Sequence, residues 1–467
     1  MTALWELTAT ELAARLRAGE VSAAEAVESS LDRIDAVNPR VNAIVTLDAA
    51  GARATAARLD RLDPSQRGPL HGMPIAVKDL EDTAGLRTTY GSPLYADHVP
   101  RADTLMVARL RAAGAVIVGK TNTSEWGAGS QTFNPVFGAT RNPWALDRTP
   151  GGSSGGAAAA VASGMIPFAD GSDLGGSIRN PAALCNLTGL RPSPGRVPDP
   201  LGDPYNPMPV LGPIGRTAAD AALLLGAVAG PDRRVPLSRG WEPLPLGDLG
   251  DLGGGAAGLR VAWSPDLGDL PVAAEVAATL AQGRAALAAI GCVVGDVAVS
   301  LPGADEAFEV LRGIGFAAAF DELLRRHRDQ LKDTVIENTE YGLGLTGGQV
   351  ARALTARAAV AAWMRRLLQG HDVLALPTVQ VAAFDVETEW VREVDGRPMG
   401  SYLEWMRSCS RITVTGHPAI SVPAGFTAGG LPVGMQLVGR EGDELGLLRL
   451  AAALERHTGL TERRPPL

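Results

Sequence analysis

The chain has 467 residues, of which 46% are hydrophobic, so it can bury a sizeable core. Its net charge of −8 and its lack of a basic stripe argue against a nucleic-acid partner. No apolar run approaches the roughly 18 residues that span a bilayer, and the N-terminus does not look like a signal peptide. With three scattered cysteines, which fit a reducing compartment, these features predict a soluble, cytoplasmic protein without a membrane partner.

Helix signals open the chain. Capping boxes at Thr8 and Ser22 predict two short helices, the second of which ends at the Asn38-Pro39 pair. A third helix is predicted over about residues 48–62. Residues 1–65 are therefore interpreted as a helical layer that supports the rest of the chain.

A lysine stands at the end of a buried strand in the sequence GMPIAVKD, residues 72–79. Burial disfavours the charged form of Lys78 and lowers its pKa. Only a neutral lysine accepts a proton, so burial would make Lys78 a base. A predicted helix over 103–113 and a buried strand over 115–118 follow, which indicates a βαβ unit and a parallel sheet.

A stretch rich in glycine and serine covers residues 150–179. It contains GGSSGG at 151–156 and GGS at 175–177, separated by an Ala-rich run typical of a buried helix and a strand over 166–169. Consecutive glycines beside a serine can aim several N–H groups at one point, as an oxyanion hole requires. A serine among such donors is a candidate nucleophile if a base is near.

The three motifs GMPIAVKD, TPGGSSGG and GSDLGGSIR, in this order and at this spacing, resemble the amidase signature family of Ser-Ser-Lys hydrolases. The resemblance runs from about residue 68 to 216, the signature core, and returns over 371–455. It implies an α/β amidase signature fold: a single domain with a large mixed β-sheet core and helices on both faces. It also implies a hydrolase of linear or cyclic amides that needs no metal or cofactor.

The resemblance assigns roles to individual residues. Ser177 resembles the nucleophile, Ser153 the bridging serine that relays the proton, and Lys78 the terminal base. The peptide bond between Gly152 and Ser153 is expected to be cis. The remaining expected site residues are the oxyanion-hole N–H groups of Leu174, Gly175, Gly176 and Ser177, the acyl-side residues Ala128, Gly129 and Ser130, and the bracing pair Asp173 and Arg179.

The rest of the chain carries weaker signals. Residues 191–213 are proline-rich and expected to be irregular, and 231–258 are interpreted as a linker-like loop. A variable, mainly helical region is predicted over 259–370, and closing strands with a final helix over 371–467. Whether the aromatic group Trp390, Tyr402 and Trp405 or the cysteines Cys292 and Cys409 reach a substrate pocket stays open, as does a homodimer.

Two rival interpretations concern the same motifs. Gly-x-Ser-x-Gly around Ser153 matches the nucleophile elbow of α/β-hydrolases, with Asp372 and His417 as partners. Against it, an elbow serine follows a strand, whereas residues 142–150 look like a loop. The second rival is the glutamine-hydrolysing subunit of a tRNA-dependent amidotransferase.

Such subunits usually carry a Tyr-Asp-Gly-x-Arg motif, which this chain lacks; residues 340–344, EYGLG, are the nearest stretch. Leu174 and Asn180 also depart from those subunits. The departures favour a stand-alone amidase, and an apolar or aryl amide, or an amide of an amino-alkanoic acid, is the expected substrate.

Overall fold

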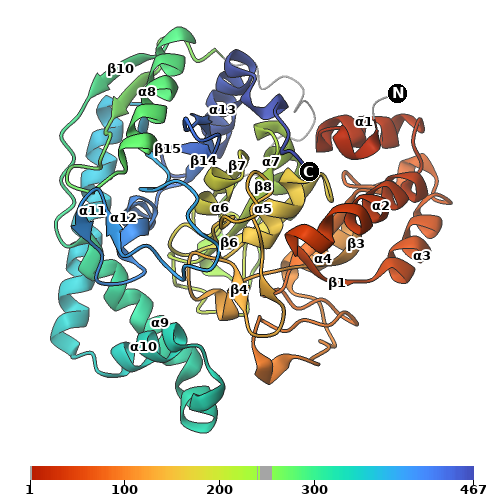
Figure 1. Ribbon diagram of the computed structural model, residues 1–467, viewed down its shortest axis with the longest axis horizontal. Helices are drawn as coiled ribbons and strands as arrows, with labels where there is room; N and C mark the ends of the chain where they lie inside the picture. The colour runs from red at the N-terminus through yellow and green to blue at the C-terminus, as the bar shows by residue number, and fades with distance from the viewer. Residues whose placement is uncertain (1–2, 239, 242–254) are drawn as a thin grey trace.

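The computed structural model describes residues 3–238, 240–241 and 255–467 and contains a large and a small β-sheet side by side (Figure 1). The large sheet has the strand order β10-β9-β11-β15-β14-β7-β8-β6, in which β10, β9 and β11 are parallel and the later neighbours antiparallel. Its strands are β6 Phe168–Asp173, β7 Thr188–Arg191, β8 Val210–Gly215, β9 Arg260–Trp263, β10 Val293–Asp296, β11 Val373–Pro377, β14 Ala419–Phe426 and β15 Pro432–Val438.

The small sheet holds the predicted βαβ unit. Strands β2 (Pro74–Lys78) and β3 (Val116–Thr121) are parallel and joined through α4 (Leu105–Ala112), while β1 (Ile44–Leu47) pairs antiparallel with β3. The parallel pairing is confirmed, although it lies in a three-stranded sheet of its own. Strand β2 packs beside β6, the edge strand of the large sheet. The junction of the two sheets therefore brings the end of β2 to the strand that precedes the second glycine cluster.

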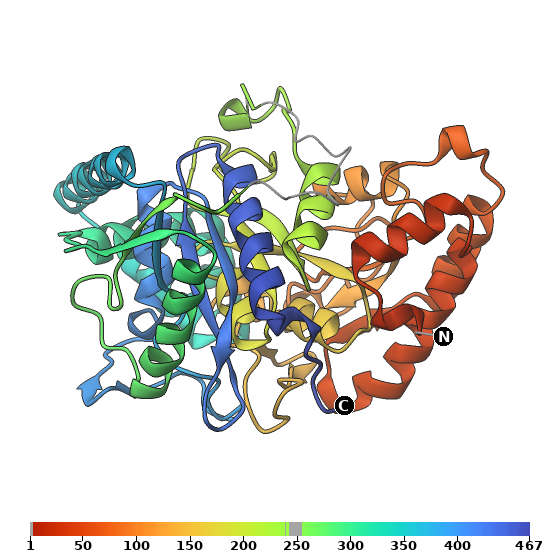
Figure 2. The ribbon, with the colours of Figure 1, turned by 90° about the horizontal axis from the view of Figure 1, so that it is seen from above.

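Helices cover both faces of the large sheet, as Figure 2 shows from above. One hydrophobic cluster joins α7 (Ala218–Val228), α8 (Ala274–Ala289) and α13 (Glu444–Thr458) to one face. A second cluster joins α5 (Gly155–Ala162) and α6 (Arg179–Leu184) to the other. The remaining long helices are α9 Ala304–His327, α10 Asp333–Leu343, α11 Gly347–Gly370 and α12 Arg407–Thr415. In the described part of the chain, no helix is both long enough and apolar enough to pass through a membrane.

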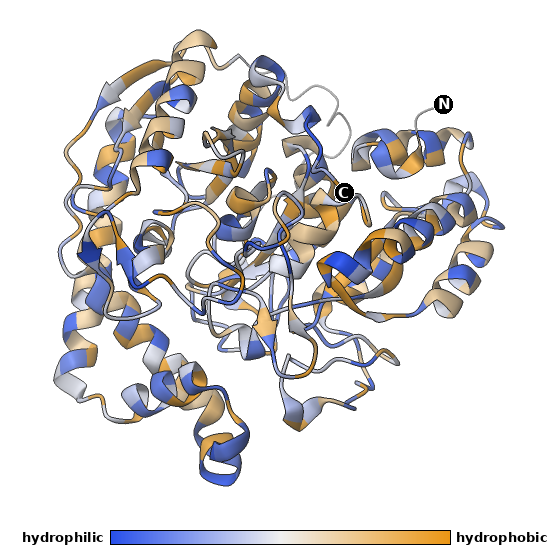
Figure 3. Cartoon of the chain, in the orientation of Figure 1, coloured by the Kyte–Doolittle hydropathy of each residue, from blue (hydrophilic) through white to orange (hydrophobic). Residues whose placement is uncertain are grey.

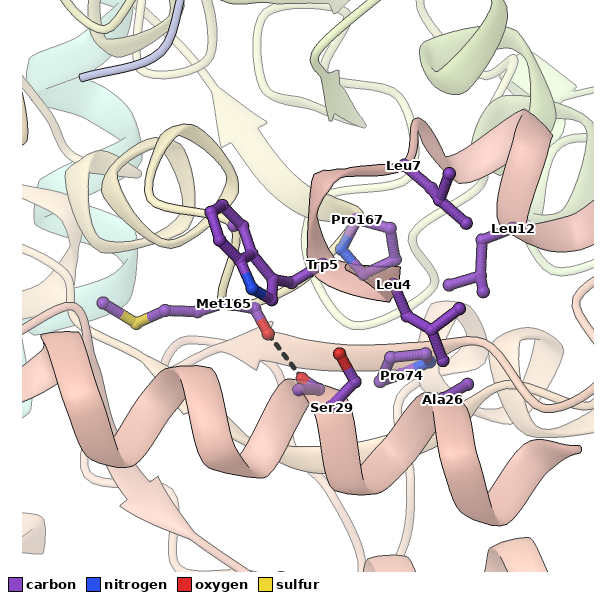
Figure 4. A pocket seen from close by; sticks show the side chains of 11 residues that line it. Leu4, Trp5, Leu7, Leu12, Ala26, Ser29, Pro74, Met165 and Pro167 are labelled. Atoms are coloured by element: carbon purple, nitrogen blue, oxygen red, sulfur yellow. Dashed lines mark hydrogen bonds between the residues drawn. The ribbon is translucent and has the colours of Figure 1, made fainter. Parts of the chain in front are cut away.

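The N-terminal layer consists of α1 (Ala9–Ala18), α2 (Ala23–Val41) and α3 (Ala49–Leu59). In Figure 3 their ribbons alternate between blue and orange, as expected for amphipathic helices. Figure 4 shows Leu4, Trp5 and Leu7 closing over α2 and the start of β2. The cavity there measures about 10 Å³, so it is a gap in the packing.

Several boundaries differ from the sequence predictions. Helix α2 does not stop at the Asn38-Pro39 pair: it continues through Pro39 to Val41, and Asn38 Oδ1 instead accepts the N–H groups of Ala43 and Ile44 beyond the helix. The stretch over 191–213, expected to be irregular, contains the start of β8. Half of the linker-like stretch 231–258 lies outside the described residues. Helix α10 falls within the region predicted to be mainly helical, whereas α12 was not predicted.

Candidate active site

Lys78, the last residue of β2, is completely buried where the two sheets meet. Its Nζ lies 2.8 Å from Ser153 Oγ, 2.8 Å from Ser154 Oγ and 2.9 Å from Ser172 Oγ. Burial lowers the pKa of Lys78 to about 8, although the carboxylate of Asp170 acts in the opposite direction. A sizeable fraction of this lysine is therefore neutral at mildly alkaline pH, as a base requires.

Strand β6 supplies two of the groups around Lys78. Side chains two residues apart on a strand face the same side. Asp170 accepts the Lys78 backbone N–H at 3.1 and 3.2 Å, and Ser172 accepts a hydrogen bond from the Lys78 ammonium. Burial raises the pKa of Asp170 to about 6. Asp170 and Ser172 were not predicted as site residues, because the strand was expected to end at residue 169. Ser154 lies in the GGSSGG motif beside Ser153, but only its neighbour was given a role.

Ser153 lies in the loop before α5, and the Gly152–Ser153 peptide bond is cis, as the resemblance led us to expect. The side chain of Thr132 holds this loop: its Oγ1 donates to the carbonyl oxygens of Gly151 and Ser153, at 2.9 and 3.2 Å, and accepts the N–H of Gly155 at 2.9 Å. The serine is therefore held from the backbone on both sides of the cis bond, with its hydroxyl directed to Lys78.

Ser177 comes from the loop between β6 and α6. Its carbonyl oxygen accepts the N–H of Ser154 at 3.2 Å, so the two glycine-serine clusters lie against each other. Ser177 is 9% exposed, and its Oγ has no hydrogen-bond partner among the described residues. The structure thus places Lys78, Ser153 and Ser177 in one small region, with the Ser177 hydroxyl unengaged.

A buried ion pair braces the Ser177 loop. Asp173 binds the Arg179 guanidinium through both oxygens, at 2.7 and 2.9 Å, and Arg191 lies 3.6 Å away. Burial by itself would raise the pKa of Asp173, but the charges of these arginines hold it well below its usual range. Asp173 also accepts the backbone N–H groups of Gly176 and Ile178 at 2.9 and 3.2 Å.

This brace bears on the expected oxyanion hole. The N–H of Gly176 is already donated to Asp173, whereas those of Leu174, Gly175 and Ser177 have no partner among the described residues. Three of the four expected donors are therefore available to a ligand. Gly176 has a φ of +120°, a backbone conformation that residues with a side chain rarely adopt, so this point of the loop requires glycine.

The acyl-side segment packs against the same loops. Ser130 Oγ donates to the Gly152 carbonyl at 3.1 Å and accepts from Asn180 Nδ2 at 2.7 Å. Gly129 and Ser130 line a small cavity together with Lys332, Trp390, Tyr402 and Trp405. The aromatic group therefore forms a pocket wall beside the site. Cys409 is buried behind Gly176, whereas Cys292 belongs to the core around α8.

The α/β-hydrolase interpretation finds no support in the geometry. Ser153 is bonded to Lys78, Asp372 accepts from Arg440 and from the backbone of Arg260, and the His417 ring contacts the carbonyl of Thr415 in its own turn. In addition, Ser153 follows a loop and not a strand. The structure does not assemble these three residues into a triad.

Comparison with known proteins defines the class. The Amidase family profile matches residues 25–448. An acylamidase of Rhodococcus erythropolis is 38% identical over 98% of this chain and 97% of its own length. The crystal structure of a bacterial aryl acylamidase of the amidase signature family superposes with a TM-score of 0.90, at 29% identity over 98% of this chain and 99% of its own.

The chain belongs to the amidase signature family and is an amide hydrolase. Its relatives include the second expected class as well: a glutamyl-tRNA(Gln) amidotransferase subunit from Roseiflexus castenholzii is 37% identical over 100% of this chain and 98% of its own length.

Proposed function

We propose that this enzyme hydrolyses the C–N bond of a carboxylic amide through an acyl-enzyme on Ser177, with Ser153 relaying the proton to Lys78. The observation that carries the proposal is the buried contact of 2.8 Å between Lys78 Nζ and Ser153 Oγ. A neutral amine has two N–H groups and one lone pair, so one of the three serine hydroxyls around Nζ must donate to it. In the proposed relay that hydroxyl is Ser153.

The proposed steps use these groups in turn. Ser177 Oγ attacks the amide carbon, its proton passes to Ser153 Oγ, and the Ser153 proton passes to Lys78. The unengaged N–H groups of Leu174, Gly175 and Ser177 stabilise the oxyanion. The proton returns through Ser153 to the leaving amine, which departs poorly unless protonated. Water then hydrolyses the ester on Ser177, which releases the acid.

Partitioning of the acyl-enzyme tests this mechanism. Hydroxylamine added to the hydrolysis of an acyl-p-nitroanilide should divert a fixed share of the acyl product to the hydroxamate. If acylation limits turnover, the rate of nitroaniline release should not change. Ser177→Ala should give neither product. Turnover that persists in Ser177→Ala, with wild-type partitioning, would refute the acyl-enzyme.

Glutamine hydrolysis for a partner is the second candidate, supported by the 37% identity with an amidotransferase subunit. The stretch nearest to the expected arginine motif lies in α10, where Gly342 packs against the backbone of Gly313 in α9, so it serves helix packing. We therefore favour a stand-alone acylamidase that acts on aryl amides. Purified protein should release p-nitroaniline from acyl-p-nitroanilides and no ammonia from glutamine; the opposite result would select the amidotransferase role. The cytoplasmic location and the homodimer stay predictions from the sequence.

A further inference from the structure

The cavity beside the acyl-side segment is lined by three hydrogen-bond donors that are unpaired or loosely paired among the described residues, together with the unpaired Oε1 of Gln131 and the carboxylate of Glu389. Its lining includes Gly129–Gln131, Tyr402 and Trp405, together with Lys332, the residue that precedes α10. The cavity adjoins both glycine loops, because Ser130 is bonded to the Gly152 carbonyl and Met406, next to Trp405, packs on Gly175.

The first of these donors is the indole of Trp405. This side chain is 1% exposed, and its Nε1 has no hydrogen-bond partner within the described ranges. An unpaired buried N–H costs free energy unless a ligand or water supplies an acceptor. Trp405 sits in the cavity wall, so an acceptor in the cavity would meet this need.

The second donor is the hydroxyl of Tyr402. Its oxygen accepts from Arg312 at 2.6 Å and from Asn338 Nδ2 at 3.0 Å. Both partners are donors, so the Tyr402 proton is not used in either bond. Among the described residues no acceptor takes it. The adjoining Arg312 guanidinium, which is buried, makes that O–H a stronger donor.

The third donor is the ammonium group of Lys332, whose side chain is 11% exposed. Its Nζ lies 3.3 Å from the Ala128 carbonyl, 4.2 Å from the centre of the Phe133 ring and 3.7 Å from Glu389. A tight charge-assisted contact is about 2.7–2.9 Å, so Lys332 is only loosely paired. Glu389, 44% exposed at the rim, can turn to solvent when a ligand carboxylate replaces it.

We propose that this cavity is a carboxylate subsite and that the preferred substrates are amides bearing a free carboxylate away from the scissile bond. Lys332 would exchange Glu389 for the substrate carboxylate, and Trp405 and Tyr402 would donate to it. The cavity measures only about 10 Å³ and Lys332 is part of its lining, so binding includes a movement of this side chain. The inference rests on the proposed function, because a substrate whose carboxylate binds in this cavity must place its scissile amide at Ser177.

Three probes test the subsite: N-butyryl-p-nitroanilide, which is neutral, N-succinyl-p-nitroanilide, with a carboxylate on the acyl part, and N-butyryl-4-aminobenzoate, with a carboxylate on the amine part. In wild type, one of the two charged probes should have a higher kcat/KM than the neutral probe. The charged probe that is preferred shows whether the subsite binds the acyl part or the amine part of the substrate. In Lys332→Met this preference should fall about 10- to 100-fold, mainly through KM. The matched control Arg392→Met removes a cation that stacks on Trp390 and should keep the preference.

A wild-type enzyme that does not prefer either charged probe, or a preference that survives Lys332→Met, would overturn the subsite. If Lys332→Met does not fold, Tyr402→Phe removes the hydroxyl donor with little change of shape and should raise KM for the charged probe alone. Calorimetric titration of Ser177→Ala with the charged and neutral probes separates the two proposals. Tighter binding of the charged probe supports the subsite even where no turnover is seen, and equal binding refutes it.

Discussion

Asp173 accepts the backbone N–H of Gly176 at 2.9 Å, inside the loop that presents Ser177. The same carboxylate binds Arg179, so one buried anion fixes both the loop and the helix that follows it. The oxyanion-hole segment is thus shaped from behind by an ion pair that has no exposed atoms in either side chain.

Replacing Asp173 with Asn should destabilise the fold strongly. The change leaves the buried Arg179 and Arg191 without their counter-ion, and breaking a buried pair in this way costs about 3–5 kcal/mol. Urea unfolding followed by circular dichroism measures the loss. The matched control is Asp232→Asn, which breaks a pair with an arginine that is 62% exposed and should change stability little. Equal effects of the two substitutions would show that the brace does not hold the loop.

The pH profile should follow Lys78. The base works in its neutral form, so kcat/KM should rise with pH through a single ionisation near the lysine pKa of about 8. The negative charge of Asp170 raises that pKa, so Asp170→Asn should move the profile to lower pH. The control Asp372→Asn should leave the pH profile unchanged, because the Asp372 carboxylate is bonded to Arg440 and not to Lys78 or its partners. A profile governed by a group near pH 6.5 in wild type would contradict the assignment.

Adjacent serines provide a sharp test of the relay. Ser153 and Ser154 both lie 2.8 Å from Lys78 Nζ, but only Ser153 is proposed to carry the proton. Ser153→Ala should lower kcat by about 10²–10⁴, the usual contribution of a positioned acid-base group, and leave a small remnant. Ser154→Ala should cost far less, because Ser172 still holds the amine. Steady-state rates decide, and the reverse order would place the relay on Ser154.

Gly176→Ala should lower kcat by about 10²–10³, the usual cost of losing one oxyanion donor. A Cβ at this position would lie 2.6 Å from Asn180 Nδ2 and 2.7 Å from Cys409 Cβ. The loop would have to shift, and the N–H donors beside Gly176 would move with it. Gly230 has a similar φ of +113° with open space around it, so Gly230→Ala carries the backbone strain without the clash. It should keep full activity and lose only stability. If both variants have wild-type kcat, the loop geometry does not matter for catalysis.

The site residues that lie in recognisable motifs could be predicted from the sequence. The residues that reach the site only through tertiary contacts could not. Lys78 was singled out by its place at the end of a buried strand, and Ser153 and Ser177 by the glycine clusters around them. Their separate roles and the cis bond were expected only from the family resemblance. Helix α12 was missed because its sequence, RSCSRITVT, is short and mostly polar. Every residue in it from Ser408 on is nevertheless buried, with polar contacts such as that of Arg179 to Thr413. Lys332 was missed because it reaches Ala128 across 204 residues of sequence.

The most direct test of the account is fluorophosphonate labelling of the native enzyme, followed by peptide mass mapping, with Lys78→Ala and His417→Ala treated alongside. The account predicts label on Ser177 that is lost in Lys78→Ala and kept in His417→Ala. Label on Ser153 that depends on His417 would contradict it and restore the Ser-His-Asp triad.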